Sequence, residues 1–534
     1  MASPRLDRRA LIKSTAAVAA APLLAPIARA GAEAEVAPLQ GMNVLLFMTD
    51  QQRFTQHFPD GWEDEHMPGL RRLKQHGVSF EQATCNTCMC SPSRATMMTG
   101  MFPAQHGVKY VLEANMPAPQ YPQVEMATDL INIGTVMAAA GYSTPYKGKW
   151  HCSKPANGNT APAQQPPCTP DEGWVPEDVN KFGFERWNPQ DAGANQFICQ
   201  AGGGVVDNDG RFMNDDGDAA AGKEGILPYL RSQAAQEQPF FLTASLVNPH
   251  DVLAYPAGFA QFGYDDSWLA STGIELPATV DEDLSTKPDA QRQLQKLVGP
   301  LLPKGTAQQQ NYLNFYGNLI KASDAYLVQI LDTLEEQGLL ENTLIVYTSD
   351  HGEMGMTHGG MIQKNFNVYE ETLRVPLVYS NPTLFPEAVQ SDALVSHVDF
   401  APTLATLFGS PTTNPDWQGQ DYSSLVLDPE SPGVQEYTVF TYDDWQAGQA
   451  QGPYVSGANH IVSVRDPRYT LARYYAPDGS APDEWEMYDR QTDPTEAVNL
   501  AWTGVSRDAE REAAYQRLLA LLEEVDKTRL QPLA

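Results

Sequence analysis

Residues 43–51 read NVLLFMTDQ, an unbroken apolar run that ends in polar side chains. Such a run is typical of a strand buried on both faces of a parallel sheet. The same pattern recurs at 239–247, which leads into Asn248-Pro249-His250-Asp251, and at 344–347, which leads into Ser349-Asp350-His351. Ligands of open α/β sheets gather at the carboxyl ends of the strands, so these three polar ends predict a single site.

Stretches typical of helices separate the three runs, for example residues 130–140 and 312–337. Strands that alternate with helices predict an α/β fold. Residues 155–235 are rich in Pro, Gly, Asn, Gln and Asp and show little periodicity. We expect them to form long surface insertions around the site rather than a domain.

The sequence predicts three parts: an export signal at 1–30, an α/β domain that carries the site at 31–430, and a smaller α+β subdomain at 431–534. The elements expected in the last part are strands at 437–442, 461–464 and 469–475 and then a helix capped at Ser506. No internal repeat is evident.

The first thirty residues have the pattern of a bacterial export signal. Arg8 and Arg9 precede a weakly apolar stretch at 16–28, and small residues at 28–30 suit cleavage. Paired arginines before a mild apolar region are typical of the twin-arginine type. We therefore expect a periplasmic or secreted protein that meets the twin-arginine translocase transiently. An ordinary secretory signal is the alternative.

Charge and composition exclude several classes of protein. The chain has 35 Lys and Arg against 66 Asp and Glu, a formal net charge of −31. A nucleic-acid binder is excluded because phosphate contacts need a basic surface. A hydrophobic content of 42% suffices for a large core. No apolar run after residue 30 reaches the roughly 18 residues of a membrane span, so none is predicted. The oligomeric state is not predicted.

Residues 90–100, CSPSRATMMTG, carry the strongest chemical signal. We expect Ser91 to cap a helix whose first position is Pro92, so that Cys90 lies at its positive N-terminal end. Free N–H groups there suit an anion, and Arg94 adds a cation on the first turn. The alternative is a buried structural cysteine beside a capping turn.

This segment resembles the signature of the sulfatase family, in which the cysteine is converted to formylglycine by a formylglycine-generating enzyme. The resemblance runs from about residue 43 to 500, in the family's order. The further matching segments are 43–51, Gly148-Lys149-Trp150-His151, 248–251, 349–353, Lys364 with 369–376, 485–489 and Asp493-Pro494. It implies an alkaline-phosphatase-like architecture: a large mixed sheet flanked by helices, with a smaller C-terminal α+β domain.

The resemblance also implies a metal site. Its ligands would be Asp50, Gln51, Cys90, Asp350 and His351. An oxygen-rich set suits Ca²⁺ first, with Mn²⁺ or Mg²⁺ as alternatives. Many sulfatases are similar but have Asp in place of Gln51 and Asn in place of His351. At both positions this chain resembles the choline-sulfatase and phosphonate-monoester-hydrolase branches. The imidazole of His351 tolerates Mn²⁺ better than an asparagine does, which puts Mn²⁺ closer to Ca²⁺ as an alternative.

The implied reaction is hydrolysis of a small-molecule sulfate ester. The metal would bind the formylglycine hydroxyl and a sulfate oxygen, and Arg94 and Lys149 would orient the geminal diol. Lys364 and His250 would hold the sulfate or the leaving oxygen, together with Lys149. In-line attack would give a sulfated hemiacetal, from which His151 would take a proton so that sulfate is eliminated. His358 loosely matches another substrate-binding histidine of the family.

Two rival functions stay open. The first keeps the same nucleophile and metal but cleaves phosphonate monoesters or phosphodiesters, as the Gln51 and His351 pair allows. The second is an inactive exported protein that binds a sulfated ligand. Retention of the whole set of catalytic residues disfavours it. No motif identifies the alcohol, whose pocket we expect the insertions at 155–235 and 252–306 to line.

The remaining cysteines are Cys85, Cys88, Cys152, Cys168 and Cys199. The spacing of Cys85, Cys88 and Cys90 resembles half of a zinc knuckle, but no second pair completes it. A Cys152–Cys168 disulfide would clip a loop beside the site, and export permits one. The sequence leaves the pairing open.

Overall fold

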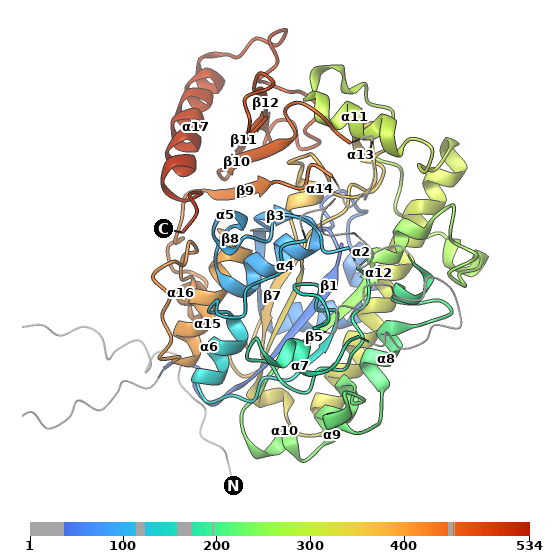
Figure 1. The fold of residues 1–534 in the computed structure, drawn as a ribbon, viewed down its shortest axis with the longest axis vertical. Coiled ribbons are helices and arrows are strands. Elements are labelled where there is room, and N and C mark those ends of the chain that lie inside the picture. Colours follow the sequence, from blue (N-terminus) through green and yellow to red (C-terminus); the bar gives the residue numbers. More distant parts are fainter. Residues whose placement is uncertain are drawn as a thin grey trace, which may run out of the picture. The chain divides into compact units, whose positions relative to one another are not determined.

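A seven-stranded mixed sheet forms the centre of the computed structural model, which describes residues 37–113, 123–156, 173–194, 197–446, 452 and 454–533 (Figure 1). The predicted export signal at 1–30 lies outside these residues. The strands, in spatial order, are β4 (Tyr146–Gly148), β5 (Phe241–Pro249), β1 (Asn43–Asp50), β6 (Thr343–Ser349), β7 (Leu377–Ser380), β2 (Gly77–Thr84) and β8 (Val389–Ser396). The predicted α/β class is confirmed.

Strands β4, β5, β1 and β6 run parallel to one another, whereas β7 is antiparallel to both of its neighbours. In register, Thr49 of β1 lies opposite Ser349 of β6, and Asp50 lies opposite Pro249 of β5. The polar residues that follow the apolar runs therefore emerge at one edge of the sheet, as the sequence predicted.

The side chains of β1 divide between two cores because successive residues of a strand point to opposite faces. Leu45 and Phe47 pack in the core that holds α12 (Gly305–Glu336). Val44, Leu46 and Met48 pack in the other core. That core holds α4 (Cys90–Thr99), α6 (Ile133–Ala139) and α15 (Phe400–Phe408). Every residue of β1 is buried, which explains its continuous apolar sequence.

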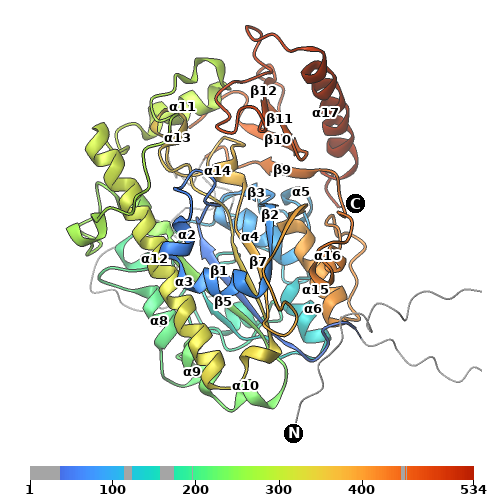
Figure 2. The ribbon, with the colours of Figure 1, turned by 180° about the vertical axis from the view of Figure 1, so that it is seen from behind.

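A second sheet of five strands lies at the top of the molecule with α17 (Ala509–Thr528) beside it (Figures 1 and 2). Its strands, in spatial order, are β12 (Glu484–Asp489), β11 (Tyr469–Tyr475), β10 (His460–Arg465), β9 (Thr438–Tyr442) and β3 (Thr87–Cys88). Strand β3 comes from far earlier in the chain and pairs Cys88 with Tyr442. The C-terminal sheet therefore holds the segment just before Cys90. The subdomain boundary near residue 430 stays a prediction.

The helix cap predicted at Ser506 is wrong. Helix α17 begins at Ala509, and the Asp508 carboxylate caps it by accepting a hydrogen bond from the Arg511 N–H at 2.9 Å. Aspartate is as good an N-cap as serine, so sequence alone does not choose between the two positions.

The described parts of 155–235 contain short helices rather than loops alone. Helix α8 (Asn208–Asn214) buries Phe212, which packs with Val247 of β5. The remaining elements of the chain are α2 (Trp62–His66), α3 (Pro68–Gln75), α5 (Pro103–His106), α7 (Glu177–Asn180), η1 (Ile198–Gln200), η2 (Ala219–Ala221), α9 (Ile226–Arg231), α10 (Ala234–Glu237), η3 (His250–Ala254), η4 (Asp266–Leu269), η5 (Leu284–Thr286), α11 (Asp289–Val298), η6 (Leu340–Asn342), α13 (Thr357–Gly360), α14 (Glu370–Leu373), η7 (His397–Asp399) and α16 (Ser423–Leu427). Among the described residues, no helix is long and apolar enough to cross a membrane.

Candidate active site

Four neighbouring parallel strands each end in a residue that the sequence singled out. Lys149 follows β4, His250 follows β5, Asp50 ends β1, and Asp350 follows β6. All four side chains are buried. The sheet thus brings two carboxylates, an ammonium group and an imidazole together at its carboxyl edge.

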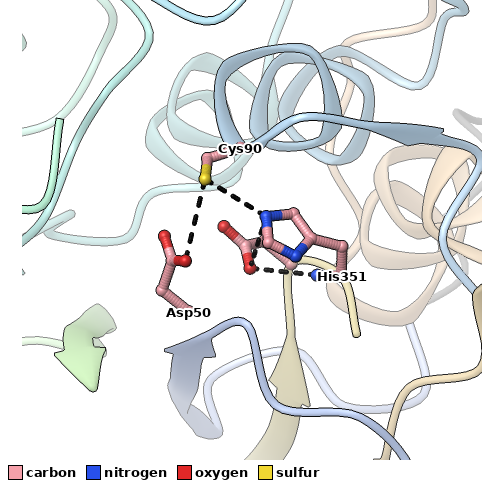
Figure 3. A group of neighbouring side chains, drawn as sticks. Asp50, Cys90 and His351 are labelled. Carbon is pink, nitrogen blue, oxygen red and sulfur yellow. Dashed lines mark hydrogen bonds and ion pairs between the residues drawn. The ribbon is translucent and has the colours of Figure 1, made fainter. Parts of the chain in front are cut away.

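Helix α4 presents Cys90 to this edge. The cysteine is the first residue of the helix, and its Sγ lies 3.1 Å from His351 Nε2 and 3.7 Å from Asp50 Oδ1 (Figure 3). The prediction that Ser91 caps the helix is wrong, because Met89 is the N-cap residue and Ser91 Oγ accepts a hydrogen bond from the Leu112 N–H. Pro92 accordingly lies third in the helix, where its missing N–H still breaks no helical hydrogen bond. Cys90 remains at the positive helix end, as expected.

Donor atoms of Asp50, Cys90, Asp350 and His351 all lie within 4.8 Å of one another and could hold a metal ion. We call these four residues the metal group. The His351 ring is oriented for such a role. Its Nδ1 donates a hydrogen bond to the Gly352 carbonyl at 3.0 Å, which leaves the lone pair of Nε2 facing the cluster. Two buried carboxylates with an imidazole form a donor set that fits a divalent ion.

Arg94 and Lys149 partly neutralise the two carboxylates. Arg94 Nε donates to Asp350 Oδ2 at 2.9 Å, and its Nη2 donates to Asp50 Oδ2 at 3.2 Å. Lys149 Nζ lies 2.5 Å from Asp50 Oδ2. Burial alone would raise the pKa of Asp50, but the charges of Lys149 and Arg94 outweigh it and hold this pKa well below its usual range. The pKa of Asp350, by contrast, is raised to about 6 by burial and by the charge of Asp50.

Gln51 lies beside the cluster in a left-handed backbone conformation, with φ of 71°. Its Oε1 accepts a hydrogen bond from Lys364 Nζ at 2.6 Å, and its Nε2 donates to Glu353 Oε2 at 2.5 Å. Gln51 thus connects Lys364 to the edge of the metal group. Burial lowers the pKa of Lys364, but its interactions with Cys90, Asp50 and Glu353 outweigh burial and raise that pKa.

Two of the predicted site histidines, His151 and His250, are held in the neutral form. Burial and the nearby Lys149 lower the pKa of His151 well below its usual value, and the same two causes act on His250. His151 Nε2 donates to the Leu112 carbonyl at 2.8 Å, whereas its Nδ1 is buried and has no hydrogen-bond partner. His151 therefore offers one unused basic nitrogen.

Comparison with known proteins identifies the family. The model of the family described as Sulfatase matches residues 42–410, and that described as N-sulphoglucosamine sulphohydrolase, C-terminal, matches residues 357–526. The chain belongs to the sulfatase family. It is therefore a hydrolase that acts on sulfuric ester bonds, and the alkaline-phosphatase-like fold expected from the resemblance is confirmed.

Individual relatives are also named as sulfatases. This sulfatase is 26% identical over 463 residues to an ulvan-active sulfatase of Formosa agariphila, in an alignment that covers 86% of this chain and 76% of the relative. It is 27% identical to a choline-sulfatase of Rhizobium meliloti, with 86% and 82% covered. A solved 2-O GAG sulfatase shares the fold at 19% identity, with a TM-score of 0.67 and 91% and 92% of the two chains covered.

The structure does not place His358 with the other predicted site residues of this sulfatase. Its Nδ1 lies 2.7 Å from Glu282 Oε2, and its ring stacks on Tyr369 with 3.5 Å between the ring centroids. Its role in substrate binding stays a prediction.

Two supporting residues were not predicted. Asp191 accepts hydrogen bonds from the backbone N–H groups of Trp150 and His151, both at 2.8 Å. It lies in an insertion without a readable motif, so the sequence carried no signal for it. Glu353, which holds Gln51, does lie in the quoted segment 349–353, and its place just after the metal residues was the available signal.

The sequence left the cysteine pairing open, and a Cys152–Cys168 disulfide does not form. Cys152 is a free buried thiol, as are Cys85 and Cys88, whereas Cys199 is in a disulfide. Cys168 lies outside the described residues. Cys152 packs in the same core as α4, α6 and α15.

Proposed function

We propose that this sulfatase hydrolyses sulfate monoesters with a formylglycine made from Cys90, beside a divalent ion held by Asp50, Gln51, Asp350 and His351. The observation that carries the proposal is the packing of Cys90 Sγ against His351 and Asp50 at the carboxyl edge of the sheet. When bound, the ion supplies charge that polarises the sulfate and acidifies a hydroxyl at position 90. Formylglycine supplies, as its hydrate, two hydroxyl groups on one carbon.

The ligand set favours Ca²⁺, with Mn²⁺ as the nearest alternative. Two carboxylates and an amide oxygen are hard donors, whereas the single imidazole is tolerated better by Mn²⁺. Gln51 Oε1 already accepts from Lys364, but a carbonyl oxygen has a second lone pair with which to bind a cation.

His151 is the proposed base. Because its pKa is depressed by burial and by Lys149, the ring is neutral at pH 7 and its unpartnered Nδ1 is free to accept a proton. Removing the proton of the second hydroxyl at position 90 would release sulfate and restore the aldehyde. Asp191 fixes the backbone of His151 and so positions the ring.

The cations of the site divide into two groups. Arg94 is committed to protein partners, since it also donates to the Lys149 carbonyl and to Ser245 Oγ, so we assign it to holding the ligands and position 90. Lys149, Lys364 and His250 are assigned to the sulfate group and the leaving oxygen.

A second candidate activity is hydrolysis of phosphonate monoesters or phosphodiesters, which the Gln51 and His351 pair favours. Comparison of kcat/KM on an aryl sulfate, an aryl phosphodiester and a phenyl phosphonate tests the choice. We expect the sulfate to be cleaved best. A clear preference for either phosphorus ester would overturn the assignment.

We further propose export to the periplasm or medium through the twin-arginine route, after modification of Cys90 by a formylglycine-generating enzyme. The signal-like residues 1–30 and the disulfide at Cys199 support it, since disulfides persist in oxidising compartments. Replacing Arg8 and Arg9 by Lys is expected to leave activity in the cytoplasmic fraction. Unchanged export would contradict the route.

A further inference from the structure

A cavity of about 360 Å³ opens between the insertions that follow β4 and β5. Its walls include Phe197, Ile198, Leu253, Tyr255, Phe262 and Ile362. Leu301, also in the lining, is 59% exposed. A concave and mostly apolar lining of this kind is typical of a small-molecule site.

Three parts of the lining are close in sequence to residues of the catalytic site or to their hydrogen-bond partners. Leu253 lies in the short helix η3, which begins with His250. Ile362 and Gln363 immediately precede Lys364. Phe197 lies four residues after Gly193, whose carbonyl accepts a hydrogen bond from Lys149 Nζ at 2.6 Å. The cavity is therefore bounded by the segments that carry the proposed sulfate-binding groups.

One wall is also fixed to the metal group. The Gln363 N–H donates to Glu353 Oε1 at 2.9 Å, and the other oxygen of the same carboxylate holds Gln51. The position of this wall relative to Asp50 and Cys90 is therefore set by hydrogen bonds rather than by a loose loop.

No described residue that lines the cavity carries a charge; the polar side chains among them are glutamines and a tyrosine. A second cavity of about 280 Å³ differs, because Arg53, His57 and Glu371 line it. A polyanionic sugar needs basic groups around it, and a cationic alcohol is held best where carboxylates accompany aromatic faces. The described part of the lining supplies no charged group of either sign.

Glu113 is an acidic residue whose charge interacts with Cys90, so its carboxylate would attract a cationic alcohol at the site. Burial, followed by the neighbouring Asp444 and Cys90, raises the pKa of Glu113 well above its usual range. Burial thus favours the neutral form of this carboxyl group, which weakens its attraction for a cationic alcohol.

We propose that this cavity binds the alcohol part of the substrate, and that this alcohol is uncharged and largely apolar, an aryl or medium-chain alkyl group. The inference rests on the proposed function, since it takes the sulfate group to lie between Cys90, Lys149, His250 and Lys364. Aromatic faces at Phe197, Tyr255 and Phe262 would pack on the ring or chain.

Sulfate esters of primary alcohols test which class of alcohol the enzyme accepts, because their leaving groups are similar. We expect kcat/KM on hexyl sulfate to exceed that on choline sulfate, methyl sulfate and N-acetylglucosamine 6-sulfate by at least tenfold, mainly through KM. A choline sulfate or sugar sulfate turned over better than hexyl sulfate would overturn the inference. Failure to cleave any sulfate ester would instead overturn the proposed function.

Substitutions in the cavity test whether the preference for hexyl sulfate arises there. Leu301→Asp places a charge on an already exposed position, so folding is preserved, and Leu253→Asp places one deeper. Both are expected to lower kcat/KM on hexyl sulfate at least tenfold and to leave the inhibition constant of inorganic sulfate within about twofold, since a change of 0.4 kcal/mol is twofold. Leu533→Asp, at another exposed leucine, is the matched control. Equal effects of all three variants, or no effect of either cavity variant, would contradict the assignment.

Discussion

At the scale of single residues, the site is a balance of buried charges. Asp50 faces Lys149 and Arg94 at 2.5 and 3.2 Å, and Asp350 shares Arg94. A buried charge without a partner is strongly unfavourable, so each of these groups depends on the others. The chemistry of position 90 therefore depends on a set of residues that come from four strands and a helix.

Asp50 is expected to matter far more than Gln51. Asp50 contributes a ligand oxygen and a full negative charge, whereas Gln51 contributes a neutral oxygen. Asp50→Asn should lower kcat/KM by roughly 10³-fold or more, and Gln51→Ala by roughly 10- to 100-fold, as for groups that support a metal ligand. Steady-state kinetics with metal analysis of both variants check this. Equal losses would contradict the division of roles.

His151 gives a prediction about pH. Its pKa in the folded protein is depressed, so the neutral base persists as the pH falls through 6.5 and is lost only in more acidic solution. We expect kcat to show no decline centred on pH 6.5.

His151→Ala should lower kcat by roughly 10²- to 10⁴-fold, the usual contribution of a general base. The variant should release one equivalent of alcohol in a burst and retain the sulfate. Unimpaired sulfate release from this variant would show that another group is the base.

At the scale of elements, a buried ion pair joins the second sheet to α14, the short helix that precedes β7 of the main sheet. Arg465 of β10 donates to both carboxylate oxygens of Glu370 in α14, at 2.7 and 2.9 Å. Burial alone would raise the pKa of Glu370, but Arg465 and Arg490 reverse this and hold it far below its usual value. The pair thus contributes stability above the unfolded pKa of about 4.3, which is lost as the solution becomes more acidic.

Removing one partner of this pair leaves a buried charge. Glu370→Gln should lower the free energy of unfolding by roughly 3–5 kcal/mol. Arg72→Ala, which breaks an exposed pair with Asp332, should cost about 1 kcal/mol or less. Urea unfolding of both variants compares them, and equal effects would contradict a special role for the buried pair.

The apolar runs predicted the central strands because strands buried on both faces have an unmistakable sequence, as β1 does. The motifs predicted Asp50, Cys90, Lys149 and Asp350 because each lies at the end or start of a regular element. The insertions at 155–235 and 252–306 were expected beside the alcohol pocket, but Asp191 and the individual residues of the cavity could not be predicted, since their positions depend on tertiary packing. Strand β3 was missed because two residues carry no periodicity, and its partner β9 lies about 350 residues later.

At the scale of the whole molecule, an acidic chain surrounds a cationic site. The net charge is −31, yet Arg94, Lys149 and Lys364 lie within hydrogen-bonding distance of the metal group or of Gln51 beside it. Screening over roughly 8–10 Å makes these near charges decisive for a small anion, while the distant acidic surface slows the approach of polyanions.

The metal group also connects β1, β6 and α4, which are distant in sequence. Removing the ion is therefore expected to abolish activity and to lower Tm, because the carboxylates of Asp50 and Asp350 would lose part of their neutralisation. Ca²⁺ or Mn²⁺ should restore both. Full activity in a protein shown by elemental analysis to be free of metal would refute the site.

The central claim is that Cys90 acts only after conversion to formylglycine. A thiolate that attacked sulfur would have no second hydroxyl with which to expel sulfate, so the enzyme would remain blocked after one turnover. Mass spectrometry of the proteolytic peptide that spans residue 90, taken from active protein, tests this most directly. We predict a residue that has lost sulfur and gained a carbonyl, in proportion to specific activity, and an inactive but folded Cys90→Ala variant. Fully active protein with an unmodified thiol at position 90 would contradict the account.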